Sequence, residues 1–431
     1  GLVVTMNPSR EILEGGTVVI EKDRIQAVLP KGQWTPSGGE EVLDAAGKLV
    51  IPGLVNCHIH SRPFRALGDE LSSPEWHSRY AYTLSTLMDE ESTYWGALNA
   101  FAECIRGGVT CVANMPPSVV GSDRAAWEIG VRAFLFPHGG DDPGMVDANE
   151  PLEKSLENVR KAGDQRDKRV KIWFGFGHPN ECSREYFRKM REYATQCQTG
   201  IHGHVSLNAR ELASNLERYG KPIVEYFQDT GFLGKDVIFG HGTYLNEKEI
   251  RIMAETGTGL AHNPRANMRY GSGVTPIPEM LKAGVCIGLG TDGPLSSYRI
   301  DMFEAMRLAC FLQRLHKKDI SALTAVQALE MATLGGAKLL GLEKEIGSLE
   351  AGKKADVAIV DLQQAHLAPL TTGRHSNLVA MLVFCCSAQD VESVLIDGQV
   401  VLKDRKLQTF SEAEIIAQVT AIARRILEKV P

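Results

Sequence analysis

The sequence predicts an α/β protein in which a (β/α)8 TIM barrel carries a small β-sandwich domain formed by both chain ends. The chain has 431 residues, which is more than one ordinary hydrophobic core holds. Strand-like and helical patterns alternate through its middle, and short β-rich runs occur at both ends. We expect the barrel to span residues 51–344, and residues 1–50 plus 345–431 to form the composite sandwich with a C-terminal helix.

Both chain ends contain short β-rich runs separated by glycine or Asp-Gly turns. We expect strands within residues 2–5, 17–20 and 24–28 at one end, and within residues 347–362 and 391–402 at the other. Neither set is large enough to bury a core alone, and each leaves open strand edges that the other can pair. We therefore expect the two ends to join into one unit.

Eight strand-like runs alternate with helical patterns between the two ends, which is the signature of a (β/α)8 barrel. A doubly wound sheet usually carries a glycine-rich turn after its first strand, whereas this chain has His-x-His there. The expected strands span residues 49–56, 109–114, 133–137, 170–175, 200–205, 237–240, 258–261 and 285–288. The expected helices include residues 93–105, 183–195, 208–219, 247–256 and 277–283.

The composition excludes two broad classes of protein. The formal net charge is −6, with 23% charged and 43% hydrophobic residues. No apolar run approaches the roughly 20 residues of a membrane span, and no block of lysine and arginine marks a nucleic-acid surface. These observations exclude a membrane protein and a nucleic-acid binder, and they leave a small molecule as the expected partner.

The nine cysteines include no C-x-x-C pair of the kind that zinc ribbons and redox motifs use. Most of them lie in apolar runs, where cysteine acts as a small buried hydrophobe. The first residues show no signal-like leader. We therefore expect the protein in the reducing cytoplasm.

Histidines and one aspartate recur where the expected barrel strands end. His58 and His60 close strand one, and alternation along a strand turns both side chains to the same face. TIM-barrel enzymes place their chemistry at this end of the strands. Scattered core histidines would not collect five or six of the 12 histidines at one rim. The other strand-end residues are His202 and His204 on strand five, His241 on strand six, His262 on strand seven and Asp292 on strand eight.

Six motifs follow one another along the chain: PGLVNCHIH, the strand-five His-x-His, GHGTYLNEKEI, HNPRANMRYGSG, IGLGTDG and GSLEAGKKADVAIVDL. Together they resemble the amidohydrolase superfamily over nearly the whole chain. The nearer branch contains triazine hydrolases, phenylurea hydrolases, and the S-adenosylhomocysteine, methylthioadenosine and guanine deaminases. The resemblance implies a hydrolase that acts on C–N bonds other than peptide bonds.

The resemblance implies that His58, His60, His204 and Asp292 hold one divalent metal ion. Three imidazoles and a carboxylate suit zinc first, with iron, manganese and cobalt as alternatives. Binuclear members bridge two ions with a carboxylated lysine at the end of strand four. The only lysine of that strand in this chain, Lys171, lies at its wrong end. We therefore expect a mononuclear site.

His241 and Asp292 are the expected catalytic residues. A bound divalent ion lowers the pKa of water toward neutrality, and the metal-bound hydroxide attacks the substrate. Asp292 takes the water's proton and passes it to the leaving group, while His241 orients the water or polarises the substrate. His202 matches a family position that is structural or a neighbour of the metal.

Leu207 departs from the family pattern. Deaminases of this branch have a glutamate three residues after the third metal histidine, which protonates a ring nitrogen of the substrate and carries a proton to the departing amine. Here that position is Leu207. Either another side chain replaces the glutamate or the substrate does not need it. Glu211 aligns with an ordinary helix residue, and His178 and Glu181 are alternatives without further support.

An amide, urea or carbamate has no ring nitrogen to protonate, so Leu207 favours hydrolysis of such a substrate. The sequence around His178 also lacks the Pro-His-Ala motif of the nucleoside-handling branch. The alternative activity is deamination or dechlorination of an aminated heterocycle, such as a triazine, purine or pterin. A distant alternative is a metal-free scaffold protein, which the intact ligand positions disfavour.

The expected substrate contacts are Phe64, Trp76, His178 and Leu207. Phe64 and Trp76 belong to an aromatic-rich segment, residues 61–90, that lies over the metal in this family. Such a segment favours a flat or apolar substrate. The other interpretation is that these rings pack the segment onto the barrel.

Two further expectations concern charge and assembly. Arg265, Asn267 and Arg269 follow strand seven, where they either meet an anionic group or hold their own loop in place. Many members of the superfamily are dimers, so the resemblance also implies a homodimer or higher homo-oligomer.

Overall fold

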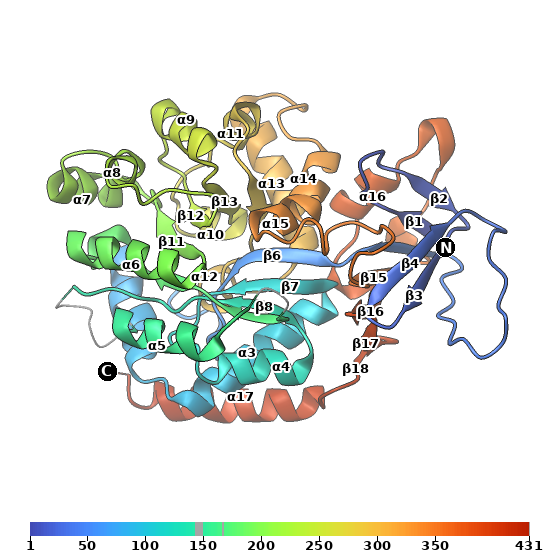
Figure 1. Cartoon of the computed structure of the whole chain (residues 1–431), viewed down its shortest axis with the longest axis horizontal. Coiled ribbons are helices and arrows are strands. Elements are labelled where there is room, and N and C mark those ends of the chain that lie inside the picture. The colour runs from blue at the N-terminus through green and yellow to red at the C-terminus, as the bar shows by residue number, and fades with distance from the viewer. Residues whose placement is uncertain (143–149, 166–167, 431) are drawn as a thin grey trace.

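Two parallel sheets form the centre of the larger unit (Figure 1). The computed structural model describes residues 1–142, 150–165 and 168–430. The first sheet contains β6 (Leu54–Ile59), β7 (Val109–Asn114), β8 (Arg132–Leu135) and β9 (Val170–Ile172). The second contains β10 (Phe174–Phe176), β11 (Ile201–Val205), β12 (Val237–His241), β13 (Gly259–His262) and β14 (Ile287–Leu289).

Short links join the two sheets at both edges. Only Trp173 separates β9 from β10, and its backbone N–H donates to the carbonyl of Leu135 at 2.8 Å. At the other edge, the N–H of Asp292 donates to the carbonyl of His58 on β6 at 2.9 Å. The two sheets contain four and five strands, and β9 and β10 together fill one position. The strands therefore occupy eight positions in succession, as in a TIM-barrel-type fold.

Helices cover the outside of these strands, and local signals set their ends. Asp89 caps α3 (Glu90–Arg106), because its side chain accepts from the N–H of Ser92 at 2.8 Å while the Ser92 hydroxyl caps Asp89 in return. The five expected helices are present, with ends displaced by at most three residues. The other helices of this unit are α4 (Ser122–Ile129), α5 (Leu152–Ala162), α6 (Arg184–Cys197), α7 (Ala209–Tyr219), α8 (Ile223–Asp229), α9 (Glu247–Thr256), α10 (Pro264–Arg269), α11 (Ile277–Ala283), α12 (Pro294–Ser297), α13 (Met302–Lys317), α14 (Ala325–Met331) and α15 (Leu334–Leu339).

The first expected barrel strand, residues 49–56, is in fact two strands in different sheets. β5 (Lys48–Pro52) pairs with strands of the chain ends, and β6 begins after Gly53. Gly53 passes so close to β7 that a Cβ there would lie 2.2 Å from the side chain of Thr110. The continuous apolar run conceals this change, because apolar composition marks burial and not the sheet that a strand joins.

Strands from both chain ends pair in one seven-stranded sheet, as the open edges predicted (Figure 1). Its order is β18, β17, β16, β15, β5, β1, β2. A separate hairpin packs on it through Ile25, which shares a buried cluster with Val3 and Val50. The remaining strands are β1 (Leu2–Val4), β2 (Ile12–Glu14), β15 (Val357–Asp361), β16 (Val391–Ile396), β17 (Gln399–Lys403) and β18 (Lys406–Leu407), with the hairpin β3 (Thr17–Glu21) and β4 (Arg24–Leu29).

The chain leaves this sheet and returns to the barrel before it ends. α16 (Leu378–Phe384) lies between β15 and β16 in the sequence, and α17 (Glu412–Leu427) runs beside α3 (Figure 1). Ile422 and Ile426 of α17 share a buried cluster with Trp76 of the segment after β6. The C-terminal helix therefore supports the segment that covers the rim of the barrel.

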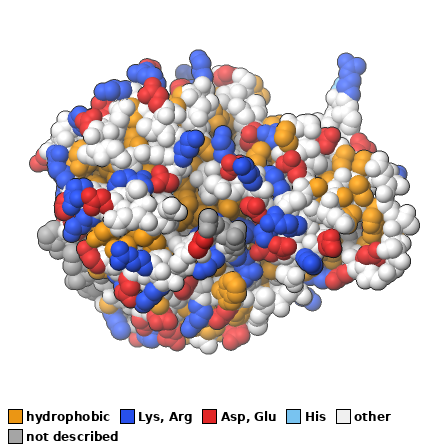
Figure 2. All heavy atoms as spheres, viewed as in Figure 1, with side chains coloured by type: hydrophobic (Ala, Val, Ile, Leu, Met, Phe, Trp, Pro, Cys, Tyr) orange, Lys and Arg blue, Asp and Glu red, His pale blue; other side chains and the backbone are white. Residues whose placement is uncertain are grey.

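The surface carries charges of both signs. Figure 2 shows lysine and arginine interspersed with aspartate and glutamate over the visible face, with apolar side chains in small groups. Within the described part of the chain, no helix is both long enough and apolar enough to cross a membrane.

Candidate metal centre and substrate pocket

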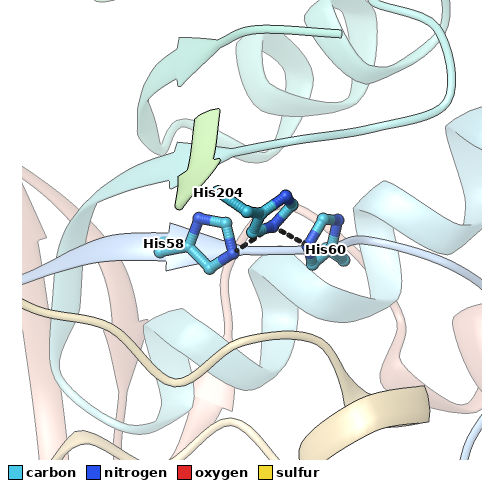
Figure 3. A group of neighbouring side chains, drawn as sticks. All are labelled: His58, His60 and His204. Atoms are coloured by element: carbon cyan, nitrogen blue, oxygen red, sulfur yellow. Dashed lines mark hydrogen bonds between the residues drawn. The ribbon is translucent and has the colours of Figure 1, made fainter. Parts of the chain in front are cut away.

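Three histidines from two segments converge at the carboxyl ends of the barrel strands (Figure 3). His58 lies in β6, His60 directly follows that strand, and His204 lies in β11. Nε2 of His204 is 3.2 Å from Nε2 of His58 and 3.2 Å from Nε2 of His60. All three side chains are buried. Strand alternation brings His58 and His60 together, and the curvature of the barrel brings His204 across to them.

The hydrogen bonds made by Nδ1 of His60 and of His204 determine whether the Nε2 atoms carry a hydrogen or a lone pair. Nδ1 of His60 lies 2.9 Å from the carbonyl oxygen of Met115, and Nδ1 of His204 lies 2.8 Å from that of Gly177. A carbonyl only accepts, so in the neutral rings both Nδ1 atoms carry the hydrogen and both Nε2 atoms present lone pairs. Burial holds the pKa of both imidazoles well below the ordinary value, which keeps them neutral. Two lone pairs 3.2 Å apart repel each other unless a cation shares them, so the donor set fits a divalent metal ion.

His202 holds the ring of His58 in place. Its Nε2 lies 2.9 Å from Nδ1 of His58, and its ring stacks on Phe136 with centroids 4.2 Å apart. Burial lowers the pKa of His58 to about 3, and burial also lowers that of His202. Both rings are therefore neutral, and the hydrogen bond between them orients His58 and gives His202 a positioning role.

Asp292 adds a carboxylate beside the histidines. Its Oδ1 lies 3.7 Å from Nε2 of His60, and its Oδ2 lies 3.9 Å from Nε2 of His241. The N–H of Gly293 and the hydroxyl of Ser296 donate to Oδ1 at 2.6 and 2.7 Å. Two hydrogen bonds thus hold Oδ1, while Oδ2 faces His241.

A chain of hydrogen bonds sets the protonation of His241. The hydroxyl of Thr275 donates to the backbone carbonyl of His241 at 2.8 Å, so its oxygen is free to accept from Nδ2 of Asn267 at 3.1 Å. The amide oxygen of Asn267 therefore faces Nδ1 of His241, 2.8 Å away, and Nδ1 carries the hydrogen. Burial lowers the pKa of His241, so the neutral ring presents the lone pair of Nε2 to the site. Of the two expected roles, this form suits orienting a water molecule.

A cavity opens over these donors. The segment with α1 (Ser73–Trp76), a π-helical turn (His77–Tyr82) and α2 (Thr83–Thr86) forms one side of it. His77 stacks on Tyr270 with centroids 5.6 Å apart, which gives this side an aromatic face. The cavity is lined by His60, Arg62, Trp76, His77, Ala81, Tyr82, Ser85, His138, His178, His204, Leu207, His241, Tyr270, Asp292 and Ser296.

Three of the four expected substrate contacts line the cavity, and the fourth does not. Trp76, His178 and Leu207 line the cavity. Phe64 is not among the described residues that line it, and our expectation for this ring is corrected. Its side chain is 4% exposed and packs with Leu84 in a buried cluster, so it supports the aromatic segment from beneath.

Glu211 is not an ordinary helix residue, which corrects our expectation for it. It stands in the first turn of α7, which Asn208 caps, and its side chain is turned back into the protein. Its Oε2 lies 3.1 Å from Nδ1 of His178, and its Oε1 accepts from the N–H of Ser206 at 2.5 Å. His178 stacks on His204 with centroids 4.7 Å apart. The buried carboxylate of Glu211 and the partly exposed imidazole of His178 thus meet at the cavity that Leu207 also lines.

Sequence reasoning named Glu181 as an alternative without further support, and it missed the polar wall of the cavity that Arg62 and His138 form. The hydroxyl of Tyr82 donates to Oε1 of Glu181 at 2.7 Å, and Oε2 of Glu181 lies 3.8 Å from Nδ1 of His138. Arg62 also lines the cavity and is buried. A charged residue two positions after His60, at the end of an apolar strand, is the signal that points to Arg62 in the sequence.

The residues after strand seven mostly hold their own loop. Arg265 pairs with Glu304, and Arg269 lies over the Trp76 ring, 4.5 Å from its centroid. His262 does not join the metal donors: it is fully buried, and neither ring nitrogen has a hydrogen-bond partner among the described residues. Burial lowers its pKa to about 3. The strand-seven histidine is therefore a neutral core residue.

Comparison with known proteins finds relatives along the whole chain. The sequence profile of the amidohydrolase family matches residues 49–401. A 5-methylthioadenosine/S-adenosylhomocysteine deaminase from Desulforudis audaxviator is 36% identical over 422 residues, which cover 96% of this chain and 96% of that protein. A 5'-deoxyadenosine deaminase from Methanosarcina mazei is 35% identical over 435 residues, which cover 99% of this chain and 97% of that protein. The solved structure of an adenosine deaminase from Xanthomonas campestris with bound zinc has a TM-score of 0.93 at 28% identity, over 99% of this chain and 97% of that chain.

Proposed function

The chain belongs to the amidohydrolase family, and from this membership we propose that it is a hydrolytic deaminase of an aminated heterocycle. It is a metal-dependent hydrolase that acts on C–N bonds other than peptide bonds. The names of the relatives favour deamination over the amide, urea or carbamate substrate that Leu207 led us to expect. The observation that carries the proposal is the His178–Glu211 pair, since it offers a substitute for the missing glutamate.

The donor set defines where a metal ion would be held. We assign His58, His60, His204 and Asp292 as ligands of one divalent ion, zinc first, because their donor atoms converge and the other ring nitrogens are engaged. Such an ion lowers the pKa of water and supplies hydroxide near neutral pH. Lys171, the lysine nearest in sequence to the end of strand four, lies over the Phe134 ring, 5.6 Å from its centroid. This placement supports a single ion.

In this proposal, Asp292 removes a proton from the attacking water and His241 orients that water. Oδ1 of Asp292 is held by two hydrogen bonds, so Oδ2 is the oxygen that takes the water's proton. Nε2 of His241 lies 3.9 Å from that oxygen and presents a lone pair. It accepts a hydrogen bond from the water and directs the oxygen's attacking electron pair toward the substrate.

His178 supplies the proton that a ring nitrogen needs. Attack at the carbon bearing the amino group moves an electron pair onto the neighbouring ring nitrogen, which must be protonated as the new C–O bond forms. Glu211 accepts from Nδ1 of His178 and stabilises the imidazolium, as a buried carboxylate does in other catalytic pairs. The C–N bond then breaks, and the amine leaves as ammonia with the proton that Asp292 took from water. As the carbonyl forms, the proton of the new hydroxyl group returns to His178 and restores the imidazolium.

Leu207 itself supports a second candidate. It lines the cavity and transfers no protons, and an amide, urea or carbamate requires none at a ring nitrogen. In that reaction the same metal donors and Asp292 would act on a carbonyl carbon, and the leaving group would be an amine or an alcohol.

A release assay with zinc-, iron- and manganese-loaded protein separates the candidates. One set of substrates contains 5'-deoxyadenosine, guanine and an aminotriazine, and the other contains an anilide, a phenylurea and a carbamate. We expect ammonia from at least one aminated heterocycle and nothing from the second set, with Asp292→Asn as the inactive control. Amine release from the second set alone would favour the second candidate. A protein that retains no metal and hydrolyses nothing would favour the scaffold.

A further inference from the structure

Arg62 is a buried arginine in the wall of the substrate cavity. It follows His60 by two residues, is 9% exposed, and lines the cavity together with Tyr82, Tyr270 and Asp292. The metal donors do not include it, and the deamination steps described above do not use it.

The guanidinium of Arg62 has no partner among the described residues. No hydrogen bond from it and no carboxylate within 4.0 Å of it is found there, and its Nε is buried without an acceptor. A guanidinium stays charged in proteins and offers five N–H donors. A buried charge without a partner destabilises the folded state, because no counter-charge offsets the loss of its hydration.

Arg132 shows how this chain treats a buried arginine that has a structural role. Arg62 and Arg132 are the two buried arginines in the described part of the chain. Arg132 is 6% exposed, and its guanidinium donates to Asp356 at 3.1 and 3.2 Å and to Asp397 at 2.5 Å. The fold thus fully pairs the arginine that it buries in its core, whereas the arginine in the cavity wall is left unpaired.

The carboxylates of Glu181 and Asp292 are already engaged with other partners. Glu181 accepts from the hydroxyl of Tyr82, and Oδ1 of Asp292 accepts from Gly293 and Ser296. The guanidinium therefore remains a free binding group for an anion that enters the cavity.

We propose that Arg62 binds a carboxylate carried by the substrate, so that the substrate is a small acidic aminated heterocycle. The planar fork of a guanidinium matches the two oxygens of a carboxylate. Arg62 lines the same cavity as Asp292 and Tyr270, so a carboxylate bound to it faces the reacting centre and the aromatic side of that cavity. The class of ring rests on the proposed deaminase function, whereas the binding of the anion does not.

A matched pair of probes tests the binding step by itself. 2-Aminopyrimidine-4-carboxylate and 2-aminopyrimidine-4-carboxamide have nearly the same shape and differ in charge. We expect zinc-loaded protein to bind the carboxylate about tenfold more tightly than the carboxamide by calorimetry, because a charged hydrogen bond is gained. The preference should vanish in Arg62→Met, persist in part in Arg62→Lys, and remain in the control Arg65→Met, whose arginine pairs with Glu103 outside the cavity.

Measurements of stability and of ammonia release separate a failure of the Arg62 proposal from a failure of the deaminase proposal. Removing an unpaired buried charge should leave the melting temperature of Arg62→Met equal to or above that of the native protein. The proposal is overturned if the native protein shows no preference for the carboxylate, if Arg62→Met keeps the preference, or if that variant loses stability and affinity for both probes. Preference for the carboxylate without ammonia release from any heterocycle would overturn the deaminase function and leave the role of Arg62 standing.

Discussion

Nδ1 of His178 lies 3.1 Å from Oε2 of Glu211, so an imidazole–carboxylate pair joins the loop after β10 to the first turn of α7. Burial lowers the pKa of His178, but the hydrogen bond and charge of Glu211, together with the charges of Glu181 and Asp292, raise it above the ordinary value. Leu207, the residue at the family's glutamate position, lines the same cavity and carries no proton. In the proposed deamination, this pair supplies the proton that Leu207 cannot supply.

Replacing Glu211 tests this pair. Glu211→Gln keeps the shape of the side chain but removes the charge that stabilises the His178 imidazolium. We expect kcat to fall by about 100-fold, the lower range of general acid catalysis, while metal content stays unchanged. The matched control is Glu217→Gln, an exposed position on the same helix. Equal kcat values for the two variants would contradict the role assigned to the pair.

Removing the metal tests the donor set. We expect one equivalent of zinc per chain by elemental analysis, and a chelated protein that is inactive and melts at a lower temperature, because an ion that binds only the folded state stabilises it. His60→Ala and His204→Ala should each lose the metal and the stabilisation, since each removes one of the lone pairs that converge 3.2 Å apart. Two equivalents of metal would contradict a mononuclear site. An unchanged melting temperature after chelation would argue against the site as a whole.

Asn267 should act on catalysis through His241. Asn267→Leu removes the acceptor 2.8 Å from Nδ1 of His241, so the hydrogen is no longer held on that nitrogen. We expect kcat to fall by about 10-fold to 100-fold, as for other residues that orient a metal-site histidine, with little change in KM. Met268→Ala, at an exposed neighbouring position, is the control. A change in KM alone would assign Asn267 to substrate binding instead.

Glu249 should make stability depend on pH. This buried carboxyl lies at the start of α9, and burial raises its pKa from 4.5 to about 7. Because the folded pKa is above the unfolded one, the contribution of this group to stability is fully present below pH 4.5 and is lost as the pH rises through about 7. From pH 4 to pH 8 we expect the native protein to lose on the order of 1–3 kcal/mol relative to Glu249→Gln. Denaturant unfolding at both pH values measures this difference.

The exposed neighbour Glu247 supplies the control for that measurement. Its side chain is 93% exposed, so Glu247→Gln should follow the pH dependence of the native protein. A native protein and a Glu249→Gln variant with parallel pH profiles would show that the buried carboxyl keeps its ordinary titration.

Much of the fold could be predicted from the sequence, because the alternation of strand and helix patterns is a local property. The strands of the barrel lie within a few residues of their expected positions, and the two chain ends share a sheet. The division of residues 49–56 at Gly53 could not be predicted, since an apolar run looks the same whether its strand joins one sheet or two. The sequence left two interpretations of Phe64 open, because burial in a core and contact with a substrate favour the same side chain, and the structure places this ring in a buried cluster.

By itself the sequence determined which residues could hold a metal. Alternation along a strand turns His58 and His60 to one face, and the rim of a barrel collects the ends of distant strands. The resemblance to the amidohydrolase superfamily then implied which residues of the rim, His204 and Asp292, complete the ligand set. Only the tertiary structure decided how the surroundings complete the site. Three features depend on where side chains from separate loops point. They are the partner of His178, the protonation of His241, and the lack of a partner for Arg62 among the described residues. Those directions follow from packing across the whole rim, which no local pattern of residues records.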